Sequence, residues 1–314
     1  MKHGLVTALL LTLIMALYHP SHAETPADSL EVGVWETTLK LDLNAAQTAY
    51  SDSWEGGAAG SFTWVSLLYG SAQKRFNEWF HFKSTLKASF GQTLTQNADT
   101  KEWSKPQKAT DEIDWENIGK FTLKWPVDPY VAARLETQFW DASYEPIARY
   151  FNPLLLTYSA GGSRLIYKRD KEEVTTRVGF ALRQMIRSEI ADTAAQSTRD
   201  TTTWDGGIEW VTDAQLNFTD RVAYIGKLTV FKAFFNSASD QLKGTPIEND
   251  WKAVDVNMKN AFLFKFSKVL AMNLYLQLIY DKELDKRVQL KEILGVGFSF
   301  TLIQYSIILI VRAN

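Results

Sequence analysis

Apolar and polar residues alternate with a period of two along most of the chain. From Leu270 to Tyr280, large apolar side chains occupy every second position, while Asn273 and Gln277 fall between them. Successive side chains of a β-strand point to opposite faces of the sheet. The pattern therefore predicts a strand with one apolar and one polar face.

Twelve segments of this kind follow one another along the chain. After the N-terminal region no apolar run reaches the roughly 18 residues that a membrane-spanning helix requires, which excludes a helical membrane protein. The predicted strands are 32–44, 57–70, 75–91, 111–125, 130–140, 153–168, 173–188, 204–218, 221–235, 251–266, 269–281 and 287–302.

Short and long connections alternate between these segments. The short ones are 70–75, 125–129, 168–173, 219–221 and 267–268, and the longer polar ones are 44–57, 91–111, 140–153, 188–204, 236–251 and 281–287. Outer-membrane barrels have short periplasmic turns and longer extracellular loops. The sequence therefore predicts an all-β fold, an antiparallel up-and-down transmembrane β-barrel of twelve strands with both termini in the periplasm.

A soluble exported β-protein is the main alternative, because a sandwich would bury the apolar face that a barrel shows to lipid. Two observations favour the barrel. The segments are longer than the typical soluble strand of about five or six residues. Aromatic residues such as Trp35, Trp125 and Tyr280 also gather near strand ends, as in the girdles at membrane interfaces.

The N-terminus has the form of a secretory signal peptide. Lys2 precedes an apolar run from Leu5 to Tyr18, and Ser21-His22-Ala23 has the small-x-small pattern of a cleavage site. We therefore expect residues 1–23 to direct export through the periplasm to the outer membrane. Outer-membrane lipid and the barrel-assembly machinery are then the expected partners of a single barrel domain, residues 24–302.

Residues 303–314 continue past the last predicted strand. This tail is shorter than the roughly 20 residues that a spanning helix needs. It either extends the last strand or is an artefact of the sequence end. The tail departs from the usual pattern, because outer-membrane barrels usually stop at an aromatic residue of the final strand.

Composition removes several classes of function. The chain has no cysteine, which excludes disulfides, thiolate catalysis, cysteine-bound metals and a lipid anchor on cysteine. Its 34 basic and 36 acidic residues are mixed, without a basic run suited to nucleic acid. No phosphate-binding glycine loop and no calcium loop pattern occurs, so we expect no cofactor and no nucleic-acid partner.

Several motifs, in a fixed order, resemble an uncharacterised family of bacterial outer-membrane β-barrel proteins that is defined only as a domain of unknown function. The motifs are Trp54-x-Gly56-Gly57 with Ser61-Phe62, Phe76-Asn77-Glu78-Trp79, Lys108-Ala109-Thr110-Asp111, Phe151-Asn152-Pro153, and the closing stretches 278–281, 288–292 and 295–300. The resemblance covers nearly all of the mature chain. It implies the fold and the location, and it brings no catalytic or binding residues.

Enzymatic chemistry has one weak candidate. Once the signal is removed, His81 is the only histidine, so any serine–histidine or metal site would have to include it. Strand parity places His81 in the lumen beside Trp79 and Lys83. A hydrogen-bonded structural role is favoured, and we predict no enzyme activity.

The polar faces predict a lumen in which both signs of charge are mixed. Strands 173–188 and 204–218 stand out, because Arg177, Arg183 and Arg187 would lie beside Glu209 and Asp213, with Arg183 opposite Glu209. The predicted lumen charges are Glu36, Lys40, Asp42, Lys83, Lys87, Asp114, Glu116, Lys120, Lys124, Arg134, Glu136, Arg177, Arg183, Arg187, Glu209, Asp213, Asp255, Lys259, Lys265 and Lys291.

Charges inside a barrel can line an aqueous path or cross-link the interior into a closed plug. The leading hypothesis is passage of a small polar or anionic solute, selected by the basic ladder Arg177, Arg183 and Arg187. The alternative is a closed structural or binding barrel that uses its outer loops, including Trp103 and the loop from Ala191 to Thr203. An outer-membrane enzyme acting on lipids is the third and least favoured class.

Overall fold

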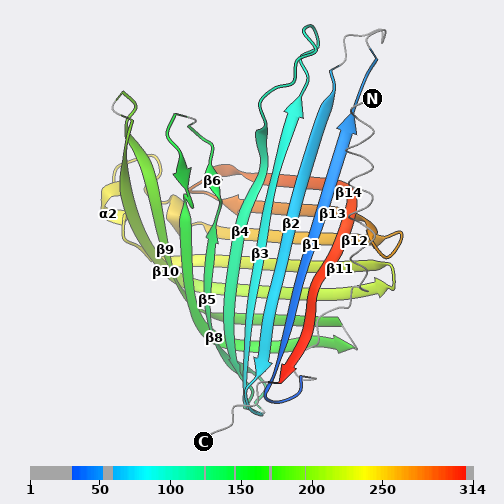
Figure 1. Ribbon diagram of the computed structural model, residues 1–314. Coiled ribbons are helices and arrows are strands. Elements are labelled where there is room, and N and C mark those ends of the chain that lie inside the picture. The colour runs from blue at the N-terminus through cyan, green and yellow to red at the C-terminus, as the bar shows by residue number, and fades with distance from the viewer. Residues whose placement is uncertain are drawn as a thin grey trace, which may run out of the picture.

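A computed structural model describes residues 30–51, 59–123, 125–144, 146–169, 172–194 and 196–308. In this part of the chain, twelve strands form a closed barrel in which every strand pairs antiparallel with the next (Figure 1). The strands follow one another around the barrel in chain order. Two further short strands, β6 and β7, pair only with each other. The predicted twelve-stranded up-and-down barrel is confirmed.

The barrel strands cover most of the described residues. They are β1 (Val34–Thr48), β2 (Ser61–Arg75), β3 (Phe80–Thr95), β4 (Gln107–Phe121), β5 (Asp128–Thr137), β8 (Leu154–Arg169), β9 (Glu172–Asp192), β10 (Ser197–Thr219), β11 (Val222–Asn236), β12 (Val254–Lys265), β13 (Leu270–Asp281) and β14 (Asp285–Ile308). Outside the barrel lie β6 (Trp140–Asp141), β7 (Arg149–Tyr150), the helix α2 (Ser239–Leu242) and the 3-10 helix η2 (Asp250–Lys252).

The period-two pattern sorts side chains between the lumen and the outer surface. On β9, Arg177 and Ala181 are buried in the interior, whereas Val178 and Phe180 are about half exposed on the outside, at 49% and 52%. The same sorting holds on β10, where Val211 is fully buried in the interior and its neighbour Trp210 is exposed on the outside. A barrel with a polar interior and an apolar exterior results, as the alternation predicts.

The two ends of the barrel differ in their connections. One end has the short connections 76–79, 122–127, 170–171, 220–221 and 266–269, and the other has the connections 49–60, 96–106, 138–153, 193–196, 237–253 and 282–284. Val34 and Ile308, at the outer ends of the pair β1–β14, lie opposite each other. The described chain therefore starts and finishes at the short-turn end.

One predicted long loop is wrong. The pattern predicts a long polar connection over residues 188–204, but β9 and β10 continue through it, with Ser197 opposite Asp192 and Thr201 opposite Arg187. The strands remain paired because Thr198, Thr201 and their neighbours favour extended backbone even though they are polar. Figure 1 shows this hairpin projecting at the end that carries the longer connections.

The last strand also extends beyond its predicted end at residue 302. Ile303 pairs with Leu39, and pairing continues to Val34 opposite Ile308. Residues 303–308 thus continue β14, because β1 offers them an otherwise unpaired edge at the seam where the barrel closes. The predicted signal peptide 1–23, the Trp54-x-Gly56-Gly57 motif, Lys124 and residues 309–314 lie outside the described residues.

No helix in the described ranges is long and apolar enough to cross a membrane.

At the short-turn end, aromatic rings cluster on the outer surface. Phe80 packs against Phe121 with ring centroids 5.1 Å apart, and Trp79 stacks on Phe121 at 6.1 Å. Trp79 therefore faces outward and not into the lumen beside His81 as parity predicts, because it precedes β3 and lies in the turn.

The lumen as candidate functional site

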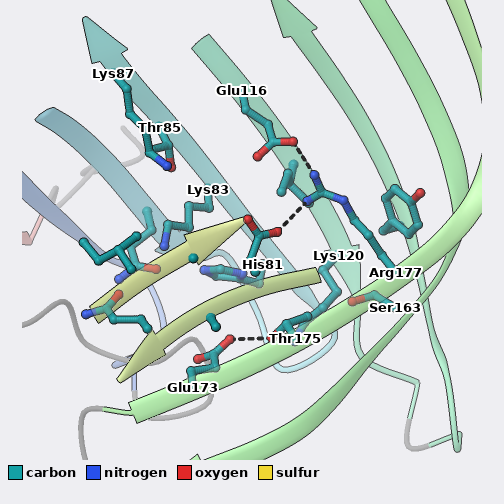
Figure 2. A pocket seen from close by; sticks show the side chains of 18 of the residues that line it. His81, Lys83, Thr85, Lys87, Glu116, Lys120, Ser163, Glu173, Thr175 and Arg177 are labelled. Carbon is teal, nitrogen blue, oxygen red and sulfur yellow. Dashed lines mark hydrogen bonds and ion pairs between the residues drawn. The ribbon is translucent and has the colours of Figure 1, made fainter. Parts of the chain in front are cut away.

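A row of polar side chains from β3 enters the lumen near the short-turn end. His81, Lys83, Thr85 and Lys87 alternate along this strand and point to the interior (Figure 2). His81 is buried, at 9% exposure. The lumen placement of His81 and Lys83 is confirmed.

Glu116 on β4 is held by two cations from strands that are not neighbours of β4 in the barrel. One carboxylate oxygen accepts from Lys227 of β11, with 2.9 Å between Lys227 Nζ and Glu116 Oε2, and the other pairs with Arg177 of β9 (Figure 2). Arg177 Nη1 also lies 3.6 Å from Asp213 Oδ2. The side chains of Glu116, Lys227 and Arg177 are at most 11% exposed.

A second set of pairs crosses the lumen beside the first. Lys259 of β12 lies 2.5 Å from Glu112 and 3.2 Å from Asp114, both on β4. Arg134 of β5 bonds Glu209 of β10 at 3.3 Å and its own neighbour Glu136 at 3.0 Å. We call these residues the ion-pair belt: Glu112, Asp114, Glu116, Arg134, Glu136, Arg177, Glu209, Lys227 and Lys259. The belt joins β4 and β5 to β9, β10, β11 and β12 through the barrel interior.

Tyr130 fills the interior next to the belt, and small residues make room for it. Its side chain is 2% exposed, and the guanidinium of Arg177 lies 5.8 Å from its ring centre. A Cβ on Gly179 would lie 2.7 Å from the Tyr130 hydroxyl oxygen, closer than atoms can approach. Glycine at position 179 therefore allows the ring to pack against the barrel wall.

The predicted pair Arg183 and Glu209 is wrong. Glu209 lies opposite Gly179, and Arg183 lies opposite Asp205. Both groups face the lumen as parity requires, but the register is displaced by four residues, because register depends on turn geometry that the alternation does not encode. Arg183 instead binds Asp205 through two nitrogens, at 2.8 and 2.5 Å, and Asp255 at 2.9 Å, with its guanidinium 3.6 Å from the Phe231 ring centre.

The remaining members of the predicted ladder have different surroundings. Arg177 belongs to the belt, while Arg187 is exposed on the part of β9 that rises toward the 193–196 connection. Asp213 is near Arg177 but keeps 41% of its side chain exposed, and Glu209 is 3% exposed. The structure therefore places the three arginines along one strand face, but two of them are already paired with carboxylates.

Two adjoining cavities border the ion-pair belt. The first, which we call the lower cavity, has a volume of about 190 Å³ and is lined by residues near the short turn before β3, such as His81 and Lys83. Lys120, Ser163 and Glu173 also line it, as do Glu116 and Arg177 of the belt. The upper cavity, about 300 Å³, lies between β1–β4 and β10–β14 and includes Lys227 and Lys259. Tyr69, Lys87, Gln215 and Ile225 line both cavities.

Sequence reasoning missed several charges of this interior, among them Glu112, Glu173, Asp205 and Lys227. Glu112 shares strand parity with Asp114 and Glu116, so parity could have found it. Lys227 was hidden because its face of β11 also carries Ile225 and Phe231, which made that face look apolar. Asp205 was missed because it lies at the start of the predicted strand 204–218, whereas β10 already begins at Ser197.

Two of the resemblance motifs meet at the long-loop end. Asp111 accepts backbone N–H bonds from Phe139 (2.7 Å) and Trp140 (2.9 Å), and Lys108 reaches Asp111 at 3.3 Å. Asn152 donates to Asp141 at 2.7 Å and accepts from the backbone N–H of Ser188 at 2.7 Å. Both motifs thus fix the connection 138–153 to the rim, which is a structural role.

Asp141 ionises readily in this setting. Burial opposes its ionisation, but hydrogen bonds from Ser143 and Asn152 and the charge of Arg149 hold its pKa below the usual value.

Across the part of the chain that the structure covers, no group of histidine and carboxylate side chains is arranged to hold a metal ion.

Neither a protein-family model nor a curated protein matches the chain. Among solved structures, it is similar to the translocator domain of the autotransporter NalP from Neisseria meningitidis, with 9% identity, 95% of each chain covered and a TM-score of 0.38. It is also similar to an outer membrane channel from Pseudomonas putida F1, with 11% identity, 90% of this chain and 99% of that chain covered, and a TM-score of 0.40. The closed barrel itself rests on the strand pairing of this chain.

Proposed function

We propose that the chain is an outer-membrane β-barrel, exported by its N-terminal signal, that admits small polar or anionic solutes to its lumen and gates their passage with the ion-pair belt. The observation that carries the proposal is that paired charges of the belt line two adjoining cavities inside one closed barrel.

The outer surface supports a lipid environment. Apolar side chains on the outward faces of the strands are about half exposed or more, among them Val131, Val178, Phe180, Leu290 and Leu294. In water such a continuous apolar surface would be strongly unfavourable, since each Å² of exposed apolar area costs about 25 cal/mol. A hydrocarbon surrounding removes that cost.

Polar atoms on the same outer surface bond to one another. The indole N–H of Trp210 donates to Thr176 at 2.8 Å, that of Trp115 donates to Ser84 at 3.0 Å, and the Tyr224 hydroxyl donates to Asn260 at 2.7 Å. Lipid offers no hydrogen-bond partners, so a spanning surface must satisfy its polar groups internally. These three pairs fit that requirement.

The belt supports gating more than a permanently open pore. Most of its pairs join strands that are not neighbours, across the lumen, and charges inside a barrel control both conduction and selectivity. Passage therefore requires that pairs such as Lys227–Glu116 separate. Four residues line both cavities, so the two spaces adjoin next to the belt, and a local rearrangement there would join them.

Planar-bilayer recording of the refolded protein tests this function. We expect small or infrequent conductance steps for the natural sequence, and larger or more frequent steps for the double variant Glu116→Gln/Lys227→Gln, which removes the pairs that Glu116 makes with Lys227 and Arg177 without changing net charge. The matched control is Asp285→Asn/Arg287→Gln, an ion pair at the exposed rim. A correctly folded belt variant that conducts no more than this control would overturn the proposal.

The arginine ladder is proposed as the element that selects charge. Arg183→Glu would replace a cation by a carboxylate beside Asp205 and Asp255, so the reversal potential in a salt gradient is expected to shift toward cation preference. An unchanged reversal potential would remove Arg183 from the selectivity element.

A closed binding barrel is the second candidate. The belt supports it if its ion pairs never separate, because the lumen would then stay blocked. The outer connections would then contact the partner. Trp103 lies in the connection 96–106, is 48% exposed, and bridges to Gln96, and the hairpin from Ala191 to Thr203 projects at the same end. Absence of conductance in every variant, with loss of a cell-surface phenotype when 96–106 is shortened, would select this candidate.

A further inference from the structure

The upper cavity combines cationic and apolar side chains in a way that a simple water-filled lumen does not require. Its wall carries six lysines and only two carboxylates: Lys40, Lys87, Lys227, Lys259, Lys265 and Lys291 against Asp42 and Glu112. Lys227 and Lys259 belong to the ion-pair belt. The wall as a whole therefore carries an excess of positive charge.

Lys291 of β14 is the clearest anion-binding group in this wall. Its Nζ donates to the Thr110 hydroxyl at 2.8 Å and lies 5.9 Å from the Tyr275 ring centre. Among the residues that the structure describes, no carboxylate lies within ion-pair distance of Lys291 Nζ. Thr110 is a neutral partner, so the charge of Lys291 is available to an anion that enters the cavity.

Apolar side chains also line this cavity beside its lysines. Val65, Leu67, Ile225, Leu263 and Ile293 occupy lumen-facing positions on β2, β11, β12 and β14, and all five line this cavity. Ile225 remains 45% exposed there. Exposed apolar surface inside a polar lumen is unfavourable unless an apolar group covers it.

From this combination we infer that the upper cavity binds a small amphipathic organic carboxylate, with its charged group at Lys291 and its aromatic or aliphatic body against Ile225 and Leu263. The volume of about 300 Å³ is at the lower end for small-molecule sites. This inference rests on the proposed function, because it names the class of solute that the gated lumen would admit.

Calorimetric titration of the detergent-solubilised full chain with 1-naphthoate tests the inference without any need for conduction. We expect saturable binding of one naphthoate per chain. Two further probes separate the contributions, since 1-naphthalenemethanol keeps the apolar body without the charge and acetate keeps the charge without the body. Both are expected to bind at least about tenfold more weakly than naphthoate.

Variants then locate the site. Lys291→Gln is expected to weaken naphthoate binding about tenfold and Lys291→Arg to restore most of it, because a hydrogen bond to a charged group contributes about that much. Ile225→Asn tests the apolar wall and is expected to weaken naphthoate but not acetate. The matched control is Lys83→Gln, a lumen lysine that lines only the lower cavity.

Three results would overturn the inference: no saturable heat with naphthoate, equal binding of naphthoate and naphthalenemethanol, or equal losses in Lys291→Gln and Lys83→Gln. Heat modifiability, the difference in gel mobility between boiled and unboiled samples, verifies that each variant is a folded barrel. Binding without conductance would overturn the gated passage and leave the carboxylate site standing, whereas conductance without binding would do the reverse.

Discussion

Lys227 and Glu116, which are 111 positions apart in the sequence, meet inside the barrel with 2.9 Å between Nζ and Oε2. Their strands, β11 and β4, are not neighbours in the barrel, so this contact crosses the lumen. Glu116 simultaneously neutralises Arg177, which makes it the carboxylate on which two buried cations depend.

Glu116→Gln is expected to destabilise the folded barrel. Arg177 and Lys227 would lose the carboxylate they share, and breaking a buried ion pair by removing one partner costs about 3–5 kcal/mol. The free energy of unfolding from guanidinium titration in detergent micelles measures the loss. Adding Lys227→Met to Glu116→Gln is expected to recover part of it, since one of the two uncompensated cations is gone. Lys227→Met alone completes the comparison. If the double variant lost as much unfolding free energy as Glu116→Gln and Lys227→Met lose together, Glu116 and Lys227 would be energetically uncoupled.

Arg183→Lys is expected to cost about 1–3 kcal/mol of unfolding free energy, because lysine cannot reproduce a two-nitrogen contact with Asp205 together with a bond to Asp255 and stacking on Phe231. Arg187→Lys on the same strand is the control. Arg187 is exposed, so its replacement is expected to stay within about 0.5 kcal/mol. Equal effects at positions 183 and 187 would contradict the Arg183 contacts.

Strand parity and strand register differ in how far the sequence determines them. Parity follows from backbone geometry alone, so the alternation of polar and apolar residues is enough to place Arg177, Arg134, Glu116 and Lys259 in the lumen. Register depends on turn conformation and on how far each strand extends. Sequence alone therefore could not pair Arg183 with Asp205.

The belt was even less accessible to sequence reasoning. Pairs such as Arg134–Glu209 and Lys259–Asp114 join strands that are not neighbours in the barrel. Their meeting depends on the tilt of the strands and on the cross-section of the barrel, and no local pattern encodes either. Small residues such as Gly179, which admit Tyr130 to the wall, contribute to that cross-section.

Glu283, in the connection 282–284, makes stability depend on pH. Although the residue keeps exposed surface, partial burial of its carboxyl group raises its pKa to about 7, and the negative charges of Asp281, Asp205 and Asp255 act in the same direction. The folded state then holds a proton that the unfolded state releases near its ordinary value, so stability is lost as the pH rises between about 4.5 and 7.

Glu283→Gln removes this dependence, because glutamine resembles the protonated carboxyl group. We expect the variant to match the natural sequence in thermal stability at about pH 4 and to be more stable at about pH 8. Melting of the purified barrel at both pH values provides the measurement. The same difference between the two proteins at pH 4 and pH 8 would show that Glu283 titrates normally.

Val178→Arg tests whether the outer surface meets lipid. Val178 faces outward from the middle part of β9, and a charge on the lipid face near the bilayer midplane costs about 2–4 kcal/mol. Ile166→Arg is the matched control, because Ile166 is exposed near the short-turn end of β8, where the cost falls to about 0–1 kcal/mol. Unfolding titrations in lipid vesicles measure both. If Val178→Arg were as well tolerated as Ile166→Arg, then Val178 would face water, and the apolar outer face would no longer require a membrane.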